Sequence, residues 1–184
     1  TPGREGTFQH DMVSALQRHG YLTIPVNTME DIMREISADN PVIIFQNLAL
    51  QWYPAWHYSV LTGFDLTEEK FLVHGGTREA KWKPFRTIAA TWNRAGSWGY
   101  IAVKKATDSQ TASLSEVVQA TAGLEAAGFG DAARASYAGV ASDQKSAQAL
   151  FGLGNVAMEK GDYEEAERNY RRAIEADPRH HYSW

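Results

Sequence analysis

His57 is the residue in the first half of the chain whose side chain and position could do chemistry. It directly follows the aromatic run QWYPAW and opens the apolar segment HYSVLTGF. An imidazole exchanges a proton near neutral pH, so a histidine at the mouth of a strand could act as a general base. A single histidine is weak evidence for a site. From the residues alone, a partly buried histidine that hydrogen-bonds a backbone carbonyl is the more common case.

The segment that carries this histidine is predicted to lie in an antiparallel sheet. Residues 56–62 are rich in aromatic and β-branched side chains, and Gly63 and Asp65 supply the residues of a turn. Further apolar strands are predicted at 70–74 and 42–45. The last of these is apolar at consecutive positions, which is typical of a strand covered on both faces. Because only short helices are predicted nearby, we expect a further segment to cover one face.

The elements before the sheet alternate between helical and extended patterns. A helix is predicted over 7–19 and an extended segment over 22–26. Thr28, followed three residues later by Asp31, resembles a capping box and predicts a helix through Ile36.

The segments after residue 74 return to the same alternation. A polar loop is predicted over 75–83, a helix from Pro84 to Trp92, and a strand over 98–103.

Five of the six tryptophans lie between positions 52 and 98. Trp52 and Trp56 are candidates to line a substrate groove near the histidine. Trp82, Trp92 and Trp98 are predicted to pack between elements, as large aromatic side chains usually do.

The second half of the chain is predicted to be helical. Residues 105–113 are polar and unpatterned, which indicates a linker. Residues 147–180 match a tetratricopeptide repeat, and residues 114–146 form a weaker copy. The positions typical of the repeat are occupied by Leu150, Leu153, Gly154, Ala157, Ala166, Tyr170, Ala173 and Pro178.

The first helix of the clear repeat presents side chains that could contact a protein partner. Repeats of this kind bind peptides through a groove on that helix, so the candidates share one helical face. They are Phe151, Asn155, Met158 and Glu159.

The run PVIIFQNLALQWYPAWHYSVLTGFD resembles the histidine segment of papain-like cysteine peptidases of the bacteriocin leader-processing type. With TPGREGT, FRTIAATWNRAGSWGYIAV and the repeat tail, nearly the whole chain resembles the bacterial branch that fuses such a peptidase to tetratricopeptide repeats. The resemblance implies an α+β fold class. The sheet-bearing half of a papain-like domain would occupy residues 1–104, and an all-α repeat array would occupy residues 114–184.

The resemblance implies that His57 is the general base for a cysteine thiol. The chain contains no cysteine. In the family the nucleophile lies on a helix upstream of the point where this chain begins, near a glutamine of the oxyanion hole. We therefore expect an N-terminal fragment of the same protein as a partner, since this polypeptide alone cannot be a cysteine peptidase.

The third catalytic group departs from the family pattern. The family places Asp or Asn at the end of the next strand, and this place falls at about His74 here. A neutral histidine accepts a hydrogen bond but does not stabilise an imidazolium as a carboxylate does. Asp65 is the nearest carboxylate in sequence, yet the hairpin would carry it to the far end of the strand.

Two functions remain open at this point. The first is a portion of a thiol peptidase that hydrolyses peptide bonds, with a repeat tail for protein binding. The second is a non-catalytic peptide-binding or scaffold protein. No cofactor is expected, and the resemblance implies a bacterial envelope protein, periplasmic or lipid-anchored.

Composition limits the other function classes. A net charge of −4 without a basic run argues against nucleic acid as a partner. No apolar stretch approaches the roughly 20 residues that a membrane span needs. The lack of cysteine excludes disulfides and thiolate metal sites. His180 and His181 are adjacent, so they would rarely share a metal ion.

Overall fold

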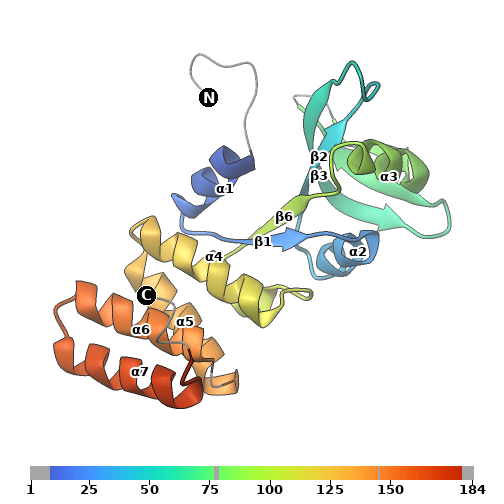
Figure 1. Cartoon of the computed structure of the whole chain (residues 1–184). Helices are drawn as coiled ribbons and strands as arrows, with labels where there is room; N and C mark the ends of the chain where they lie inside the picture. Colours follow the sequence, from blue (N-terminus) through green and yellow to red (C-terminus); the bar gives the residue numbers. More distant parts are fainter. Residues whose placement is uncertain (1–8, 77–78, 145, 180–184) are drawn as a thin grey trace. The chain divides into compact units, whose positions relative to one another are not determined.

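The computed structural model describes residues 9–76, 79–144 and 146–179 (Figure 1). Contacts divide the chain into two compact units, each described here by itself. The first contains Thr1–Met12 and Thr23–Ala112, and the second contains Val13–Leu22 and Ser113–Trp184.

In the described part of the chain, the first unit is built on a six-stranded sheet with the strand order β1-β6-β2-β3-β4-β5. Strand β2 pairs antiparallel with β3 and β6, and β4 pairs antiparallel with β3 and β5. The strands are β1 (Leu22–Val26), β2 (Val42–Asn47), β3 (Trp56–Asp65), β4 (Lys70–His74), β5 (Lys81–Pro84) and β6 (Gly99–Val103). The helices before and between them are α1 (Gln9–Gln17), α2 (Met29–Ser37) and α3 (Phe85–Asn93).

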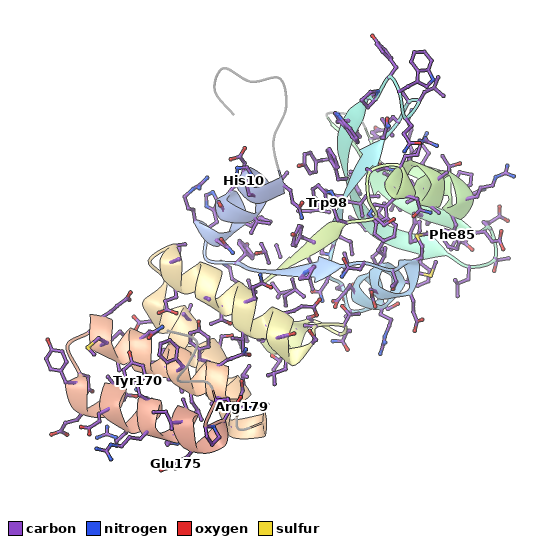
Figure 2. The ribbon with its side chains drawn as sticks, viewed as in Figure 1. His10, Phe85, Trp98, Tyr170, Glu175 and Arg179 are labelled. Atoms are coloured by element: carbon purple, nitrogen blue, oxygen red, sulfur yellow. The ribbon has the colours of Figure 1, made fainter. Side chains whose placement is uncertain are left out.

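One face of the sheet forms the hydrophobic core. Val42 and Ile44, two alternate residues of β2, are fully buried. Leu61 of β3, which pairs with Val42, is also fully buried. Phe85, in the first turn of α3, packs on Phe71 of β4 with ring centroids 4.5 Å apart (Figure 2). Helices α2 and α3 contribute further buried side chains.

The opposite face of the sheet is half-buried and aromatic. Phe45 of β2 stacks on Trp56 and Trp98, with centroids 5.1 and 4.9 Å apart, and it also contacts Tyr58 (Figure 2). The consecutive apolar residues of β2 therefore reflect a core on one side and an aromatic cluster on the other. Ring stacking within the sheet shields this second face, because aromatic pairs bury a large area against each other.

Glu35 is a fully buried carboxylate that holds α2 to the end of the first unit. It accepts five hydrogen bonds of 2.7–2.9 Å, from the backbone and side chain of Thr111, the side chains of Ser109 and Asn40, and the backbone of Gln110. Burial alone would raise the pKa of Glu35, but the bonds to the charged form outweigh it and lower the pKa below its ordinary value.

Residues 105–113, predicted from their composition as a linker, carry regular contacts of their own. They include the 3₁₀ turn η1 (Ala106–Asp108) and the three residues that bind Glu35. The boundary between the two units falls between Ala112 and Ser113. Composition did not indicate that this segment is ordered, because Glu35, the residue that it binds, lies about 75 residues away in the sequence.

The second unit contains two helical hairpins (Figure 1). Their helices are α4 (Leu114–Ala126), α5 (Gly130–Gln144), α6 (Ala147–Glu159) and α7 (Tyr163–Ala176). Two glycines of α6 let tyrosine rings lie directly on its backbone, Tyr137 on Gly152 and Tyr170 on Gly154. The predicted fold class, a sheet-bearing α+β half followed by helical repeats, is confirmed.

Two expectations for the segment after β4 were wrong. Residues 81–83, predicted to be loop, form the edge strand β5 together with Pro84, which was predicted to begin a helix. Trp82, predicted to pack between elements, is 51% exposed there. Successive side chains of a strand point to opposite faces of the sheet, and Trp82 lies on a face that is open to solvent at this edge. The segment has no apolar periodicity to mark it as a strand.

Replacing Glu35 with Gln should lower the free energy of unfolding of the first unit by about 3 kcal/mol at neutral pH. An amide cannot accept all of these bonds, and a hydrogen bond to a charged group contributes about 1.5–3 kcal/mol. Glu30→Gln on the same helix is the control, since the Glu30 carboxylate is exposed and lies 4.0 Å from Arg34. Urea unfolding followed by tryptophan fluorescence measures both, and an equal loss in the two variants would contradict the role of Glu35.

The lowered pKa also gives this comparison a pH dependence. The folded state binds the Glu35 proton less tightly than the unfolded chain, whose ordinary value is 4.5. The stabilisation is therefore complete above that value and is lost as the pH falls through the lower pKa of the folded state. Between about pH 5 and pH 3, the urea midpoint of the unmodified chain should fall more steeply than that of Glu35→Gln.

Gly152→Ala should destabilise the helical unit by about 1–3 kcal/mol, because a Cβ at this position overlaps the Tyr137 ring. Gly139→Ala on α5 is the matched control: a Cβ there meets no atom, and alanine favours a helix by up to about 1 kcal/mol. Thermal unfolding followed by circular dichroism compares the two. A gain in stability from both substitutions would show that the tyrosine does not need the glycine.

Candidate functional site

His57 lies at the second position of β3 and is half-buried. It pairs across the sheet with Gln46 of β2. Alternation along β3 places His57 on the same face as Ser59 and Leu61, which is the core face of the sheet. The imidazole therefore points to the side of the sheet that α3 covers.

A cavity of about 310 Å³ opens beside the His57 ring. Its walls come from β2, β3, β4, β5 and α3, and most of the residues that line it have polar or charged side chains. The polar and charged side chains on it include His57, Gln46, Glu79, Lys81, Lys83 and Thr87.

The floor of this cavity is a buried chain of hydrogen bonds. Ser59 Oγ donates to Gln46 Oε1 at 2.7 Å, and Gln46 Nε2 donates to Thr91 Oγ1 at 2.6 Å. Thr91 Oγ1 donates in turn to backbone carbonyls of its own helix. All three side chains are less than a tenth exposed. Since buried polar groups that are fully bonded rigidify their surroundings, this network fixes α3 against the strand opposite His57.

Gly75, directly after β4, lies against the His57 ring. A Cβ at Gly75 would be 2.9 Å from His57 Nε2, which is closer than real Cβ contacts come. The missing side chain is therefore what allows the imidazole to sit beside this backbone.

The structure does not bring His74 or Asp65 to His57. His74 pairs with Val60, so its side chain lies on the opposite face of the sheet, where its Nε2 is 3.0 Å from Thr62 Oγ1. Asp65 accepts hydrogen bonds from two backbone N–H groups of the β3–β4 turn, at 2.8 and 2.9 Å.

Trp52 and Trp56 also lie outside the lining of the His57 cavity. Trp56 is on the aromatic face, stacked on Phe45. Trp52 is 81% exposed in the β2–β3 loop, where its ring contacts Tyr53.

Asn47 shapes the β2–β3 loop. Its Oδ1 accepts from the backbone N–H groups of Ala49 and Ala55, both at 3.0 Å, and its Nδ2 donates to the carbonyl of Leu50. Arg94 donates to the Asn47 carbonyl. The exposed aromatic residues of the loop are thus presented on an ordered backbone.

Sequence reasoning missed the polar lining of the cavity. Gln46 is the polar residue at an inward position of an otherwise apolar strand, and this exception was a usable signal. Lys81 and Lys83 flank Trp82, and such a period of two would place both lysines on one face of a strand. No sequence pattern indicated that Glu79 lies near His57, because only the tertiary fold brings the loop of Glu79 to β3.

A second cavity, of about 440 Å³, lies in the helical unit between α4 and α6. Of the four residues expected to contact a partner, Phe151 and Asn155 line it, whereas Met158 and Glu159 do not. Tyr170 of α7 donates its hydroxyl to Asn155 Oδ1 at 3.0 Å, and its ring packs on Phe151 with centroids 5.1 Å apart (Figure 2).

In the described part of the chain, no group of three or more His, Cys, Asp or Glu side chains is placed to hold a metal ion. Among the helices of the same residues, none combines the length and the apolar character that a bilayer-spanning helix requires. His180 and His181 lie outside the described part of the chain.

Comparison with known protein families gives two matches. Residues 147–180 match the tetratricopeptide repeat, and they coincide with the hairpin of α6 and α7. Residues 7–100, just over half of the chain, match the Peptidase_C39 like family and contain the sheet with His57. Searches of curated proteins and of solved structures gave no significant match. On the strength of the family match, the chain belongs to the Peptidase_C39 like family and carries a tetratricopeptide repeat behind its peptidase-like part.

Proposed function

We propose that the first unit supplies the histidine side of a thiol peptidase site that hydrolyses peptide bonds, with His57 as the general base. The observation that carries this proposal is the position of His57, half-buried in a cavity lined by polar and apolar residues above a fixed hydrogen-bond network, within the part matched by the peptidase family. Because the chain contains no cysteine, the nucleophile must come from a polypeptide segment outside these 184 residues.

The chemistry would proceed in two steps. His57 takes the proton from the cysteine thiol, and the thiolate sulfur attacks the carbonyl carbon of the scissile peptide bond. The imidazolium then returns the proton to the leaving amine as the C–N bond breaks and a thioester forms. In the second step His57 takes a proton from water, the hydroxide oxygen displaces the thiolate, and a carboxylic acid is released.

The imidazolium formed in the first step needs a stabilising charge nearby. Among the described residues that line the cavity, Glu79 carries the carboxylate. Since His74 and Asp65 are bonded elsewhere, Glu79 is the better placed of these three groups to offset the charge. This proposal replaces the third catalytic group expected from sequence alone.

The helical unit would bind a protein or peptide partner through the cavity between α4 and α6. A tetratricopeptide repeat is an interaction module, and the Phe151 wall and the amide of Asn155 suit an extended peptide. The location in a bacterial envelope remains a proposal that rests on the resemblance.

A second candidate function is a peptide-binding protein without catalysis. It is favoured by the lack of cysteine and by His74, which stands near where the peptidase pattern has a carboxylate or amide. Under this proposal the His57 cavity holds a peptide and cleaves nothing.

His57→Ala should slow alkylation of the partner cysteine by iodoacetamide at least about 10-fold at neutral pH, because the thiolate loses the imidazolium that lowers its pKa. The measurement uses the polypeptide that contains this chain together with its cysteine-bearing segment, with adducts counted by mass spectrometry. His74→Ala is the control, since its side chain lies on the other face of the sheet. An unchanged rate in His57→Ala, or the absence of any reactive cysteine, would favour the non-catalytic function.

Gly75→Ala should perturb the same site without removing the histidine. The new Cβ displaces the His57 ring from its place beside the backbone, so the alkylation rate should fall by a similar factor while the fold remains. Gly63→Ala is the matched control on the same hairpin, because a Cβ there makes a contact of 3.4 Å with Leu72. Equal rates in Gly75→Ala and the unmodified protein would show that the ring position does not matter.

A further inference from the structure

The cavity between α4 and α6 has an unusual distribution of charge. Glu125 contributes a carboxylate to its lining, and none of the described residues that line it is Lys, Arg or His. The rest of the lining consists of apolar and small residues, amides and hydroxyls: Ser115, Val118, Gln119, Ala122, Tyr137, Gln148, Phe151, Gly152 and Asn155. This cavity, called the groove from here on, therefore offers one negative charge beside an apolar wall.

Glu125 is held in place by a buried partner. The hydroxyl of Tyr137 donates to Glu125 Oε2 at 3.0 Å, and the Tyr137 ring lies on the backbone of Gly152. An ionised carboxylate can accept about four hydrogen bonds, and Tyr137 provides one of them. The side chain is thus oriented by the protein and retains capacity for a ligand donor.

The surroundings of Glu125 disfavour an uncompensated charge. Burial raises the pKa of Glu125, the charge of Glu159 raises it further, and the bond from Tyr137 offsets only part of this. A cation brought to the carboxylate would relieve that penalty, because opposite charges attract strongly where water is partly excluded.

Three cations of the same unit pair with carboxylates outside the groove. Arg134 pairs with Glu165, Lys160 with Asp131, and Arg171 with Glu167. None of these basic residues lines the groove, so they do not neutralise Glu125 from within it. The described lining therefore offers no positive charge to Glu125, and a cationic ligand would complement it.

We propose that this groove binds an extended peptide segment that carries a lysine or arginine, whose cationic head pairs with Glu125 and whose aliphatic stem lies along Val118 and Phe151. The proposal rests on the proposed peptide binding by the helical unit and adds the chemistry that is recognised. Long basic side chains commonly place their stems on apolar surface while the charged head reaches a polar partner.

The amides in the lining supply contacts that do not depend on sequence. Tyr170 donates to Asn155 Oδ1 and so orients the amide, whose Nδ2 can donate to a peptide carbonyl. Gln119 and Gln148 add donors and acceptors from the two facing helices. Backbone contacts of this kind give affinity, while Glu125 selects the side chain.

The test selects ligands on the full chain from phage-displayed random peptides of about 12 residues, a length that spans such a groove when extended. We expect lysine or arginine at one position in the selected peptides. Replacing that residue with methionine should weaken binding to the unmodified chain about 10-fold, as measured by fluorescence polarisation. In Glu125→Gln the same replacement should change binding less than about 2-fold, because the amide keeps the bond from Tyr137 but carries no charge.

Glu164→Gln is the matched control. It removes one negative charge from an exposed residue of α7 that pairs with Arg168, and it should leave the effect of the methionine replacement unchanged. Circular dichroism checks that each variant remains folded.

The outcomes separate this inference from the proposed function. If no peptide is selected, or if Asn155→Ala and Phe151→Ala leave binding intact, the groove is not the binding site and the proposed peptide binding by the helical unit fails. If binding requires these residues but shows no preference for a cation, or if Glu125→Gln retains that preference, the assignment of Glu125 is overturned. A preference for lysine or arginine that is lost in Glu125→Gln and kept in Glu164→Gln supports it.

Discussion

A carboxylate withdrawn from water must be surrounded by hydrogen-bond donors, and the first unit meets this requirement at Glu35. An unpaired charge in such a place would cost several kcal/mol, so the position of α2 and the path of residues 109–111 are set together. The donors are mainly backbone and hydroxyl groups rather than a basic side chain. Such an arrangement is geometrically demanding, and it explains why a polar segment without periodicity follows a defined path.

The same principle operates at the floor of the His57 cavity, with neutral groups in place of a charge. Gln46, Ser59 and Thr91 are buried and bond one another across β2, β3 and α3. This network gives the sheet a polar spot on its core face, next to the imidazole. The aromatic cluster around Phe45 occupies the other face, so the tryptophans near His57 in sequence are separated from it in space. A strand turns consecutive residues to opposite sides, and this alternation decides which neighbours can share a site.

In the helical unit, close packing and the ligand groove depend on the same residues. Tyr137 can lie on α6 because position 152 is glycine, and from there its hydroxyl orients Glu125. Tyr170 lies on Gly154 and orients Asn155 in the same manner. Each tyrosine fills the space between helices and positions one polar group in the groove. Gly152 and Gly154 thus also shape the lining of the cavity between α4 and α6.

Local patterns in the sequence were enough for most elements of both units. The helical periodicity with its glycine and tyrosine spacing indicated the repeat, and Thr28 was a sufficient signal for the start of α2, where its side chain accepts from the backbone N–H of Asp31. Residues 56–62 were recognisable as a strand that carries His57, because strand alternation and helix capping are interactions between near neighbours. The turn expected at Gly63 and Asp65 was wrong, since β3 continues through Asp65. Only the tertiary structure decided which groups meet. Residues 81–84 form a strand because they pair with β4, and the hydrogen-bond donors of Glu35 lie far along the chain. His57 shares its cavity with Gln46 and Glu79 and not with His74. These outcomes depend on contacts between distant segments, whose geometry is set by the packing of the whole unit and leaves no periodic trace in the local sequence.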